Sequence, residues 1–386
     1  MKLLLRILIA MALGIGAGYA FPLWAARVFA TFNGIFGSFL SFIIPLLIVG
    51  FVAPAIADIG RRAGAMLGIT VAIAYAMTFG SGMLAYFTAS LTFPPLLEGS
   101  MLDTVSGDGS APLPYFRLDI QPLMTVTASL VLAFVLGFGC AVLGDKAHIL
   151  KAVVADFRNI INLVIGKLIV PLLPVYIFGI FMSMTMEGTV APILVTFIKI
   201  IAVIFVLHIA VLVLQYLIAS FFSGFNPFRS LWTMLPAYMT ALGTQSSAAT
   251  IPVTLERTIK MGVSRDVAGF VIPLCATIHM SGSTLKIVSC AVALMIVRGM
   301  PFDAAMFAGF IAMLGVTIVA APGVPGGAIM ASLGLLSGML GFSEADNALM
   351  IALYIAMDSF GTACNITGDG AIAQIVDRLF ACRTVS

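Results

Sequence analysis

Two carboxylates and two neutral polar groups share one face of an apolar stretch near the end of the sequence. Thr362, Asn365 and Asp369 follow Asp358 at offsets of four, seven and eleven residues. In an α-helix, which turns by about 100° per residue, these offsets keep all four groups on one side. Carboxylates inside an apolar helix are expensive and are functional by default, so this face predicts a functional site. The structural alternative pairs them with buried lysines, for which the candidates are Lys167, Lys199 and Lys286.

Three further polar clusters interrupt apolar segments of the last third. Residues 244–252 (TQSSAATIP) predict a chain reversal inside the protein, whereas contact between helices through small residues is the alternative. Residues 277–284 (TIHMSGST), followed by Lys286, predict an unwound stretch whose carbonyl groups suit a cation. Residues 322–327 (PGVPGG) break any helix. They predict the tip of a hairpin that acts as a gate, and a plain surface loop is the alternative.

The composition places these clusters in a membrane protein. Apolar residues make up 61% of the 386, charged residues only 9%, and the mean hydropathy is +1.17. Soluble domains carry about a quarter charged residues. The net charge of +3 is small and dispersed, so it does not suggest nucleic acid. The five cysteines lack metal-ligand or disulfide spacing, and no cofactor is expected beyond a coupling ion.

Apolar runs and helix breakers divide the chain into spans of about 20 residues or more. They lie near 3–24, 29–57, 64–92, 121–144, 159–186 and 190–223, followed by a segment interrupted at 243–252, a broken span at 267–297, an interrupted stretch at 304–340 and a final span at 347–376. Lys2 and Arg6 precede the first run, which is read as a span rather than a cleaved signal.

The charges between the spans predict the topology. With a cytoplasmic N-terminus, the basic residues collect inside only if residues 226–266 enter and leave from the cytoplasm and residues 298–346 from outside. This pattern predicts two re-entrant hairpins of opposite sidedness, an inverted repeat with its site near the bilayer midplane. The chain is therefore expected to be a multi-pass protein of the inner (cytoplasmic) membrane with both termini in the cytoplasm.

The four clusters, in this order, resemble the dicarboxylate/amino acid:cation symporter family, which includes glutamate/aspartate and neutral amino-acid transporters. Gln245 to Thr254 resembles the tip of its inner hairpin, and residues 323–330 resemble its outer hairpin. Residues 276–283 (ATIHMSGS) are similar to its broken-helix motif, usually ATINMDGT. Residues 358–369 (DSFGTACNITGD) are similar to its final-helix motif, usually D-x-x-R-T-x-x-N-x-x-G-D. The similarity is clear over about 226–383.

The resemblance implies an all-α polytopic membrane protein with eight transmembrane helices and two re-entrant helical hairpins. Residues 1–223 would be mostly scaffold and trimerisation spans, although the spans near 64–92 and 190–223 are candidates for the transport domain. Residues 224–386 would form the core transport domain. Such a homotrimer would move a small molecule across the bilayer by an elevator mechanism driven by a cation gradient.

The resemblance also assigns roles to individual residues. Asp358 would take the substrate α-amino group, while Asn365 and backbone amides around Ser246 and Ser247 would bind the α-carboxylate. The same pocket would include Met280, Ser283, Gly361 and Thr362. Cation coupling would involve Thr277, His279, Lys286, Asn365 and Asp369, with a candidate Na⁺ site at Asp369. The gate would comprise Gly323, Pro325, Gly326 and Gly327.

Departures from the motifs change the expected substrate. Gly361 stands where acidic-substrate members have arginine, and Gln245 stands where other members place it. A buried carboxylate without a cation is costly, so a neutral amino acid is favoured, with room at Gly361 for a larger side chain. If Lys286 replaces the arginine, the substrate is instead a C4-dicarboxylate or an acidic amino acid.

A second set of departures concerns the coupling ion. Ser281 replaces an aspartate of the broken-helix motif and His279 replaces an asparagine, so fewer sodium ions, or protons, are expected. A histidine that is merely hydrogen-bonded is the alternative. In a continuous helix, His279 and Lys286 would share a face. Lys286 could then place a fixed positive charge where a sodium ion otherwise sits, opposite Asp369.

Two other functional classes are weaker. An intramembrane aspartyl protease needs two carboxylates that share a proton, but Asp358 and Asp369 lie about 16 Å apart on one helix. A channel is disfavoured because opposed hairpins around one midplane site suit alternating access. The chain is therefore not expected to be an enzyme.

Overall fold

The computed structural model describes residues 2–59, 65–97, 112–188, 190–319 and 326–381, and the regular secondary structure of these ranges is entirely helical. In chain order the elements are α1 (Lys2–Ala20), α2 (Leu23–Ile59), α3 (Ala65–Leu97), α4 (Val126–Leu143), the 3₁₀-helix η1 (Gly144–Ala147), α5 (His148–Val164), the π-helix η2 (Ile165–Ile169), α6 (Val170–Met186), α7 (Val190–Ser223), α8 (Pro227–Thr244), α9 (Ser247–Lys260), α10 (Arg265–Ile278), α11 (Ser281–Val297), α12 (Ala304–Val319), α13 (Gly327–Leu340), α14 (Glu344–Ala356) and α15 (Asp358–Ala381).

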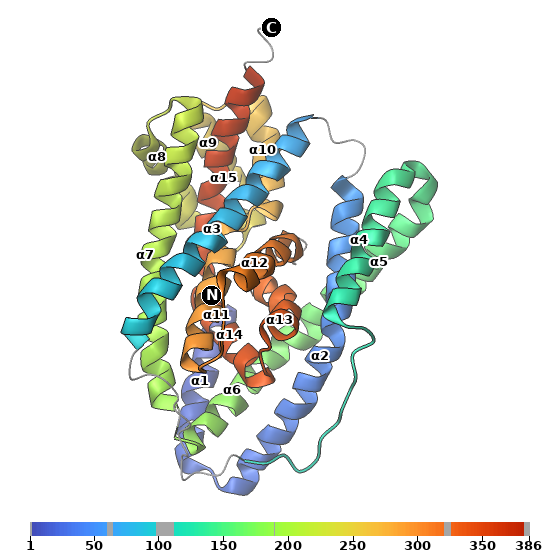
Figure 1. Cartoon of the computed structure of the whole chain (residues 1–386), viewed down its shortest axis with the longest axis vertical. Helices are drawn as coiled ribbons and strands as arrows, with labels where there is room; N and C mark the ends of the chain where they lie inside the picture. Colours follow the sequence, from blue (N-terminus) through green and yellow to red (C-terminus); the bar gives the residue numbers. More distant parts are fainter. Residues whose placement is uncertain (1, 60–64, 98–111, 189, 320–325, 382–386) are drawn as a thin grey trace.

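The helices form two groups that differ in their packing partners (Figure 1). In the first group, α1 packs on α6, and α2 packs on α4, α5 and α6. In the second, α11 and α15 lie in the middle and contact each other, while α3, α7, α8 and α10 surround them. Thus α3 and α7, which come early in the sequence, pack with the helices of the last third.

The second group has a continuously buried interior. Every residue of α11 is buried, as is every residue of α15 from Gly361 to Val376. Large apolar side chains are exposed instead on α4 and α7, where Phe138 is 58% and Phe221 is 87% exposed. A water-soluble protein does not cover its outer helices with such side chains, so this surface is typical of a membrane protein.

Five helical segments of the described chain are long and apolar enough to cross a membrane, and the bent pair α14–α15 would make a sixth. Shorter apolar helices include α12 and α13. Together these segments support a polytopic membrane protein. The expected count of eight spans stays a prediction.

A helix continues through the charged segment that the sequence analysis placed between the spans 121–144 and 159–186. The 3₁₀-helix η1 is followed at once by α5, which begins at His148. Only one side of α5 is apolar, with Val154 and Ile161 buried against the protein. Lys151 and Arg158 lie on the same helix. The polar residues therefore mark the solvated face of an amphipathic helix rather than a loop.

The predicted chain reversal at 244–252 is confirmed, although it is shorter than expected. The helices α8 and α9 pack against each other, and only Gln245 and Ser246 lie between them. Gln245 has a φ of 53°, in the left-handed region, which ends α8. Ser246 then begins α9, because its hydroxyl accepts a hydrogen bond from the backbone N–H of Ala249 at 3.3 Å. Pro252 lies inside α9.

The predicted break in the span 267–297 is also confirmed. The helix α10 ends at Ile278, His279 and Met280 have non-helical backbone angles, and α11 begins at Ser281. The face shared by His279 and Lys286 was argued from a continuous helix, so the break removes the basis for placing Lys286 opposite Asp369.

The sequence pattern at 347–376 predicted one helix for the final span, and this prediction is wrong. The helices α14 and α15 meet at 62° around Met357. Ser343 and Asp346 form a capping box that starts α14, and Asp346 also accepts a 2.9 Å hydrogen bond from Arg298. The helix α15 then begins at Asp358, so both predicted carboxylates lie on that one helix, as expected.

Candidate functional site

One small cavity lies where the turn between α8 and α9, the α10–α11 break, the start of α13 and the face of α15 meet. Its volume is about 110 Å³. The lining residues are Gln245, Ser246, Ser247, Ala248, Ala276, Thr277, Met280, Ser283, Gly327, Ala328, Tyr354, Asp358, Thr362 and Asn365. They include every residue assigned to the substrate pocket from the sequence except Gly361. None of the lining side chains is basic.

Asn365 holds the broken span in place from the neighbouring helix. Its Oδ1 accepts hydrogen bonds from the backbone N–H groups of Gly282 at 2.8 Å and Ser283 at 3.4 Å, which are the free donors at the start of α11. Its Nδ2 donates to the Ser283 hydroxyl at 3.1 Å, and Tyr354 donates to the same hydroxyl at 3.1 Å. Asn365 is therefore the N-cap that α11 lacks in its own sequence.

Asp358 is satisfied by partners on both of its oxygens. Lys286 Nζ lies 3.3 Å from Oδ1, and the backbone N–H of Gly326 donates to Oδ2 at 2.8 Å. Gly326 is the last residue before α13 and has a φ of 77°. The carboxylate thus ties the outer hairpin to α15. Of the other predicted gate residues, Gly327 lines the cavity, while Gly323 and Pro325 lie outside the described residues.

The Lys286 side chain is fully buried and lies behind the cavity rather than in its lining. Its ammonium lies 3.7 Å from the centre of the Tyr354 ring and 3.4 Å from the Met357 carbonyl oxygen. A Cβ atom added at Gly361 would lie only 2.4 Å from Lys286 Cε. The expected room at Gly361 for a larger substrate side chain is therefore wrong, because Lys286 fills it.

His279, rather than Lys286, is the partner of Asp369. Its Nδ1 lies 2.9 Å from Asp369 Oδ1 and 3.2 Å from the Asn365 carbonyl oxygen. Both are acceptors, so Nδ1 carries a proton. The Gln215 amide nitrogen lies 3.4 Å from Nε2, which suits an acceptor there. The position of Lys286 opposite Asp369 was inferred from a continuous helix and is wrong.

The two oxygens of the Asp369 carboxylate differ in their hydrogen bonding. Its Oδ2 is buried and has no hydrogen-bond partner within the described part of the chain, so it could serve a cation. However, its Oδ1 is occupied by His279. No group of three acidic, His or Cys side chains able to hold a metal is found among the described residues. Thr277 donates to the Leu274 carbonyl oxygen and lines the 110 Å³ cavity.

Helices α3 and α7 contribute polar groups that the sequence analysis did not assign. Gln215 reaches His279, and Tyr216 donates to the Thr367 carbonyl oxygen of α15 at 2.7 Å. On α3, Thr78 accepts a hydrogen bond from the Met280 backbone N–H at 3.3 Å. Isolated polar residues in otherwise apolar helices were the available signal, because they are costly without a partner.

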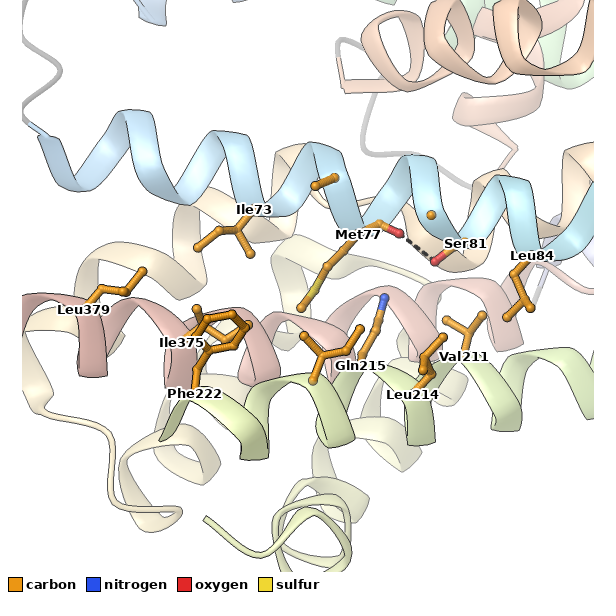
Figure 2. Close-up of a pocket in the computed structure, with 13 residues that line it drawn as sticks. Ile73, Met77, Ser81, Leu84, Val211, Leu214, Gln215, Phe222, Ile375 and Leu379 are labelled. Carbon is orange, nitrogen blue, oxygen red and sulfur yellow. Dashed lines mark hydrogen bonds between the residues drawn. The ribbon is translucent and has the colours of Figure 1, made fainter. Parts of the chain in front are cut away.

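A second cavity, of about 360 Å³, lies between α3, α7 and α15 and is almost entirely apolar. Figure 2 shows Ile73, Leu214, Phe222 and Ile375 around it, with Gln215 among them. Small-molecule sites need a few polar groups that fix the orientation of the ligand. The 110 Å³ cavity has such groups, so it is the candidate substrate site.

The 110 Å³ cavity can recognise a small zwitterion. Asp358 offers an acceptor for an ammonium group, and the N-terminus of α9, which begins after Ser246, offers backbone donors for a carboxylate. Helix termini on either side of a cavity, rather than charged side chains, are suited to binding polar groups within a membrane.

Comparisons with known proteins show the family of this chain. Residues 3–379 match the sodium:dicarboxylate symporter family. The serine/threonine transporter SstT of Acinetobacter baumannii is 26% identical over 98% of this chain and 96% of its own length. The neutral amino acid transporter B(0) of Rattus norvegicus is 30% identical over 42% of this chain and 30% of its own. An excitatory amino acid transporter of Caenorhabditis elegans is 26% identical over 73% and 57%. The chain therefore belongs to the sodium:dicarboxylate symporter family.

Proposed function

We propose that this protein is a cation-coupled symporter that carries a small neutral amino acid across the cytoplasmic membrane. The observation that carries the proposal is the 110 Å³ cavity, in which one carboxylate, hydroxyl groups and helix N-termini converge without a basic lining side chain. The relatives whose names specify serine/threonine and neutral amino acids support the same substrate class. Symport is a transport activity, so the protein is not an enzyme.

The absence of a basic lining side chain favours neutral over acidic substrates. A second substrate carboxylate in this cavity would be buried without a cation, at a cost of several kcal/mol. The nearest candidate, Lys286, lies behind Asp358 and is committed to it. The alternative of a C4-dicarboxylate or acidic amino acid would require Lys286 to leave that carboxylate.

The proposed mechanism is an elevator, in which a transport domain slides through a trimeric scaffold. The transport domain would comprise residues 224–386 together with α3 and α7, because both helices pack on α11 or α15. The scaffold would comprise α1, α2 and α4–α6, which pack with one another. Eight spans, two opposed re-entrant hairpins and cytoplasmic termini belong to the same proposal.

The coupling ion is proposed to be a proton or a reduced number of sodium ions. Asp369 keeps one free carboxylate oxygen for a cation, while His279 occupies the other. A site that donates one oxygen of Asp369 is weaker for sodium than one that donates both.

Replacing His279 by asparagine is expected to increase the dependence of uptake on sodium. The shorter side chain withdraws from Asp369 Oδ1, which then becomes available to a cation, and it adds an amide oxygen. Uptake should be measured in proteoliposomes with sodium or choline outside, and we expect the sodium-to-choline ratio to rise severalfold. His148→Asn, which changes an exposed histidine of α5, is the control. An unchanged ratio in His279→Asn would show that His279 does not limit sodium binding.

The two competing classes fit the site less well. Asp358 and Asp369 each contact a basic residue, Lys286 and His279 respectively, rather than each other. A protease dyad would need the two carboxylates in contact. A channel would show unitary currents without substrate-coupled flux.

Radiolabelled uptake into proteoliposomes tests the proposal. A panel of serine, alanine, larger neutral amino acids, aspartate and succinate should be compared under sodium, proton and no gradient. We expect serine or alanine to be accumulated only with a cation gradient. Stronger uptake of aspartate or succinate would overturn the neutral-substrate proposal.

A further inference from the structure

The carboxylate that faces the candidate substrate cavity already has a resident counter-ion. Lys286 Nζ lies 3.3 Å from Asp358 Oδ1, and the lysine side chain has no exposed surface. A buried pair of opposite charges at this distance is close to neutral when seen from the cavity. Asp358 therefore differs from an unpaired carboxylate, which would need a positive charge from its ligand.

Lys286 belongs to the protein wall and is held there by contacts on several sides. The ring of Tyr354 covers the ammonium, and the Met357 carbonyl oxygen accepts from it. Gly361 offers no side chain, and a Cβ there would lie 2.5 Å from Nζ. We therefore expect the lysine to stay beside Asp358 when a ligand binds.

The resident Lys286 ammonium changes how strongly Asp358 would bind the amino or hydroxyl group on the α-carbon of a ligand. A ligand ammonium beside the carboxylate would stand a few ångströms from the Lys286 ammonium. The repulsion between the two cations has nearly the same range as the attraction to Asp358, so most of the gain is lost. A hydroxyl group can donate a hydrogen bond to the carboxylate without adding a second positive charge, and a carboxylate has about four acceptor positions in all.

We propose that the Lys286–Asp358 pair makes the α-amino group dispensable, so that the site also accepts small α-hydroxy carboxylates. Such a ligand keeps the carboxylate that the α9 N-terminus would bind and offers a hydroxyl to Asp358. The proposal rests on the proposed function only in taking the 110 Å³ cavity as the substrate site. Lys286 acts through Asp358 and is a specificity-determining residue that does not touch the ligand.

The experiment compares ligands that differ only at the α-position. Alanine and lactate form one pair, and serine and glycerate another. Inhibition of labelled alanine and serine uptake should be measured for each ligand in proteoliposomes, together with the uptake of labelled lactate. In the wild type we expect the inhibition constant of each hydroxy acid to lie within about tenfold of that of its amino acid, a difference of about 1.4 kcal/mol or less.

Lys286→Met removes the charge and keeps a chain of similar length, so it isolates the electrostatic effect. Asp358 then needs its positive charge from the ligand, and we expect the preference for amino over hydroxy acid to rise at least about tenfold. Lys260→Met, on α9, is the matched control and should keep the wild-type ratio. A merely structural role of Lys286 would lower uptake of both ligands in each pair equally.

Each outcome is decisive. If wild-type protein takes up alanine or serine while lactate and glycerate neither compete nor are transported, the inference fails and the proposed function stands. An unchanged preference in Lys286→Met also overturns it. If that variant does not fold, thermal stabilisation of the wild type by lactate and by alanine decides, since only the inference expects comparable shifts. If no ligand of either class binds, both proposals fail.

Discussion

Replacing Asp358 by asparagine is expected to reduce amino-acid uptake by at least about a hundredfold, because it leaves Lys286 as an unpaired cation in the protein interior. Breaking a buried pair by removing one partner costs about 3–5 kcal/mol. The same change removes the negatively charged acceptor that faces the ligand and weakens the link from Gly326 to α15. All three effects lower uptake, so we expect this to be the most damaging substitution of a single charged residue.

Two further variants separate these effects. Asp358→Asn combined with Lys286→Met removes both charges, so the thermal unfolding midpoint in detergent should recover relative to Asp358→Asn alone. Uptake should stay low in the double variant because the carboxylate that faces the ligand is still missing. Asp266→Asn, which changes an exposed aspartate at the start of α10, controls for loss of a carboxylate. Uptake by Asp358→Asn above about a tenth of the wild-type rate would contradict the role given to the pair.

The sequence was sufficient for several local elements of the last third, although not for the bend between α14 and α15. The offsets of Thr362, Asn365 and Asp369 from Asp358 depend only on helix geometry, and α15 contains all four residues. The reversal at Gln245 and Ser246 and the break at His279 could be predicted as well, because clusters of polar and small residues interrupt apolar runs there. These predictions used only neighbours in the sequence.

Contacts between side chains of different helices could not be predicted in the same way. Lys286 was placed opposite Asp369 by extending one helix through the break, but the two non-helical residues, His279 and Met280, change the rotation of the side chains that follow them relative to those before. The bend of 62° before α15 then brings Asp358 to the lysine. Asn365 was assigned to the substrate, yet its amide oxygen caps α11, which only the packing of two helices reveals.

Gly361→Ala is expected to abolish most uptake, although alanine is normally the better helix former. A Cβ at this position would lie 2.4 Å from Lys286 Cε and 2.5 Å from Nζ, so the lysine must move away from Asp358. The side chain is buried on all sides, and overpacking of this kind costs about 1–3 kcal/mol. We expect uptake to fall at least about tenfold, with a smaller decrease in the thermal unfolding midpoint.

The cause can be isolated by a double-mutant cycle with Lys286→Ala. Lys286→Ala removes the three atoms that would lie nearest to the added methyl group of Gly361→Ala. The change should then be neutral or stabilising by up to about 1 kcal/mol, as helix propensity predicts. Gly269→Ala on α10, where nothing lies within 4 Å of the added atom, should behave in this way even in the wild-type background. If Gly361→Ala is equally harmful with and without Lys286, the glycine is required for another reason. A strong dependence on Lys286 would instead show that Gly361 and Lys286 act as one unit, in which the absent side chain makes room for the counter-ion of Asp358.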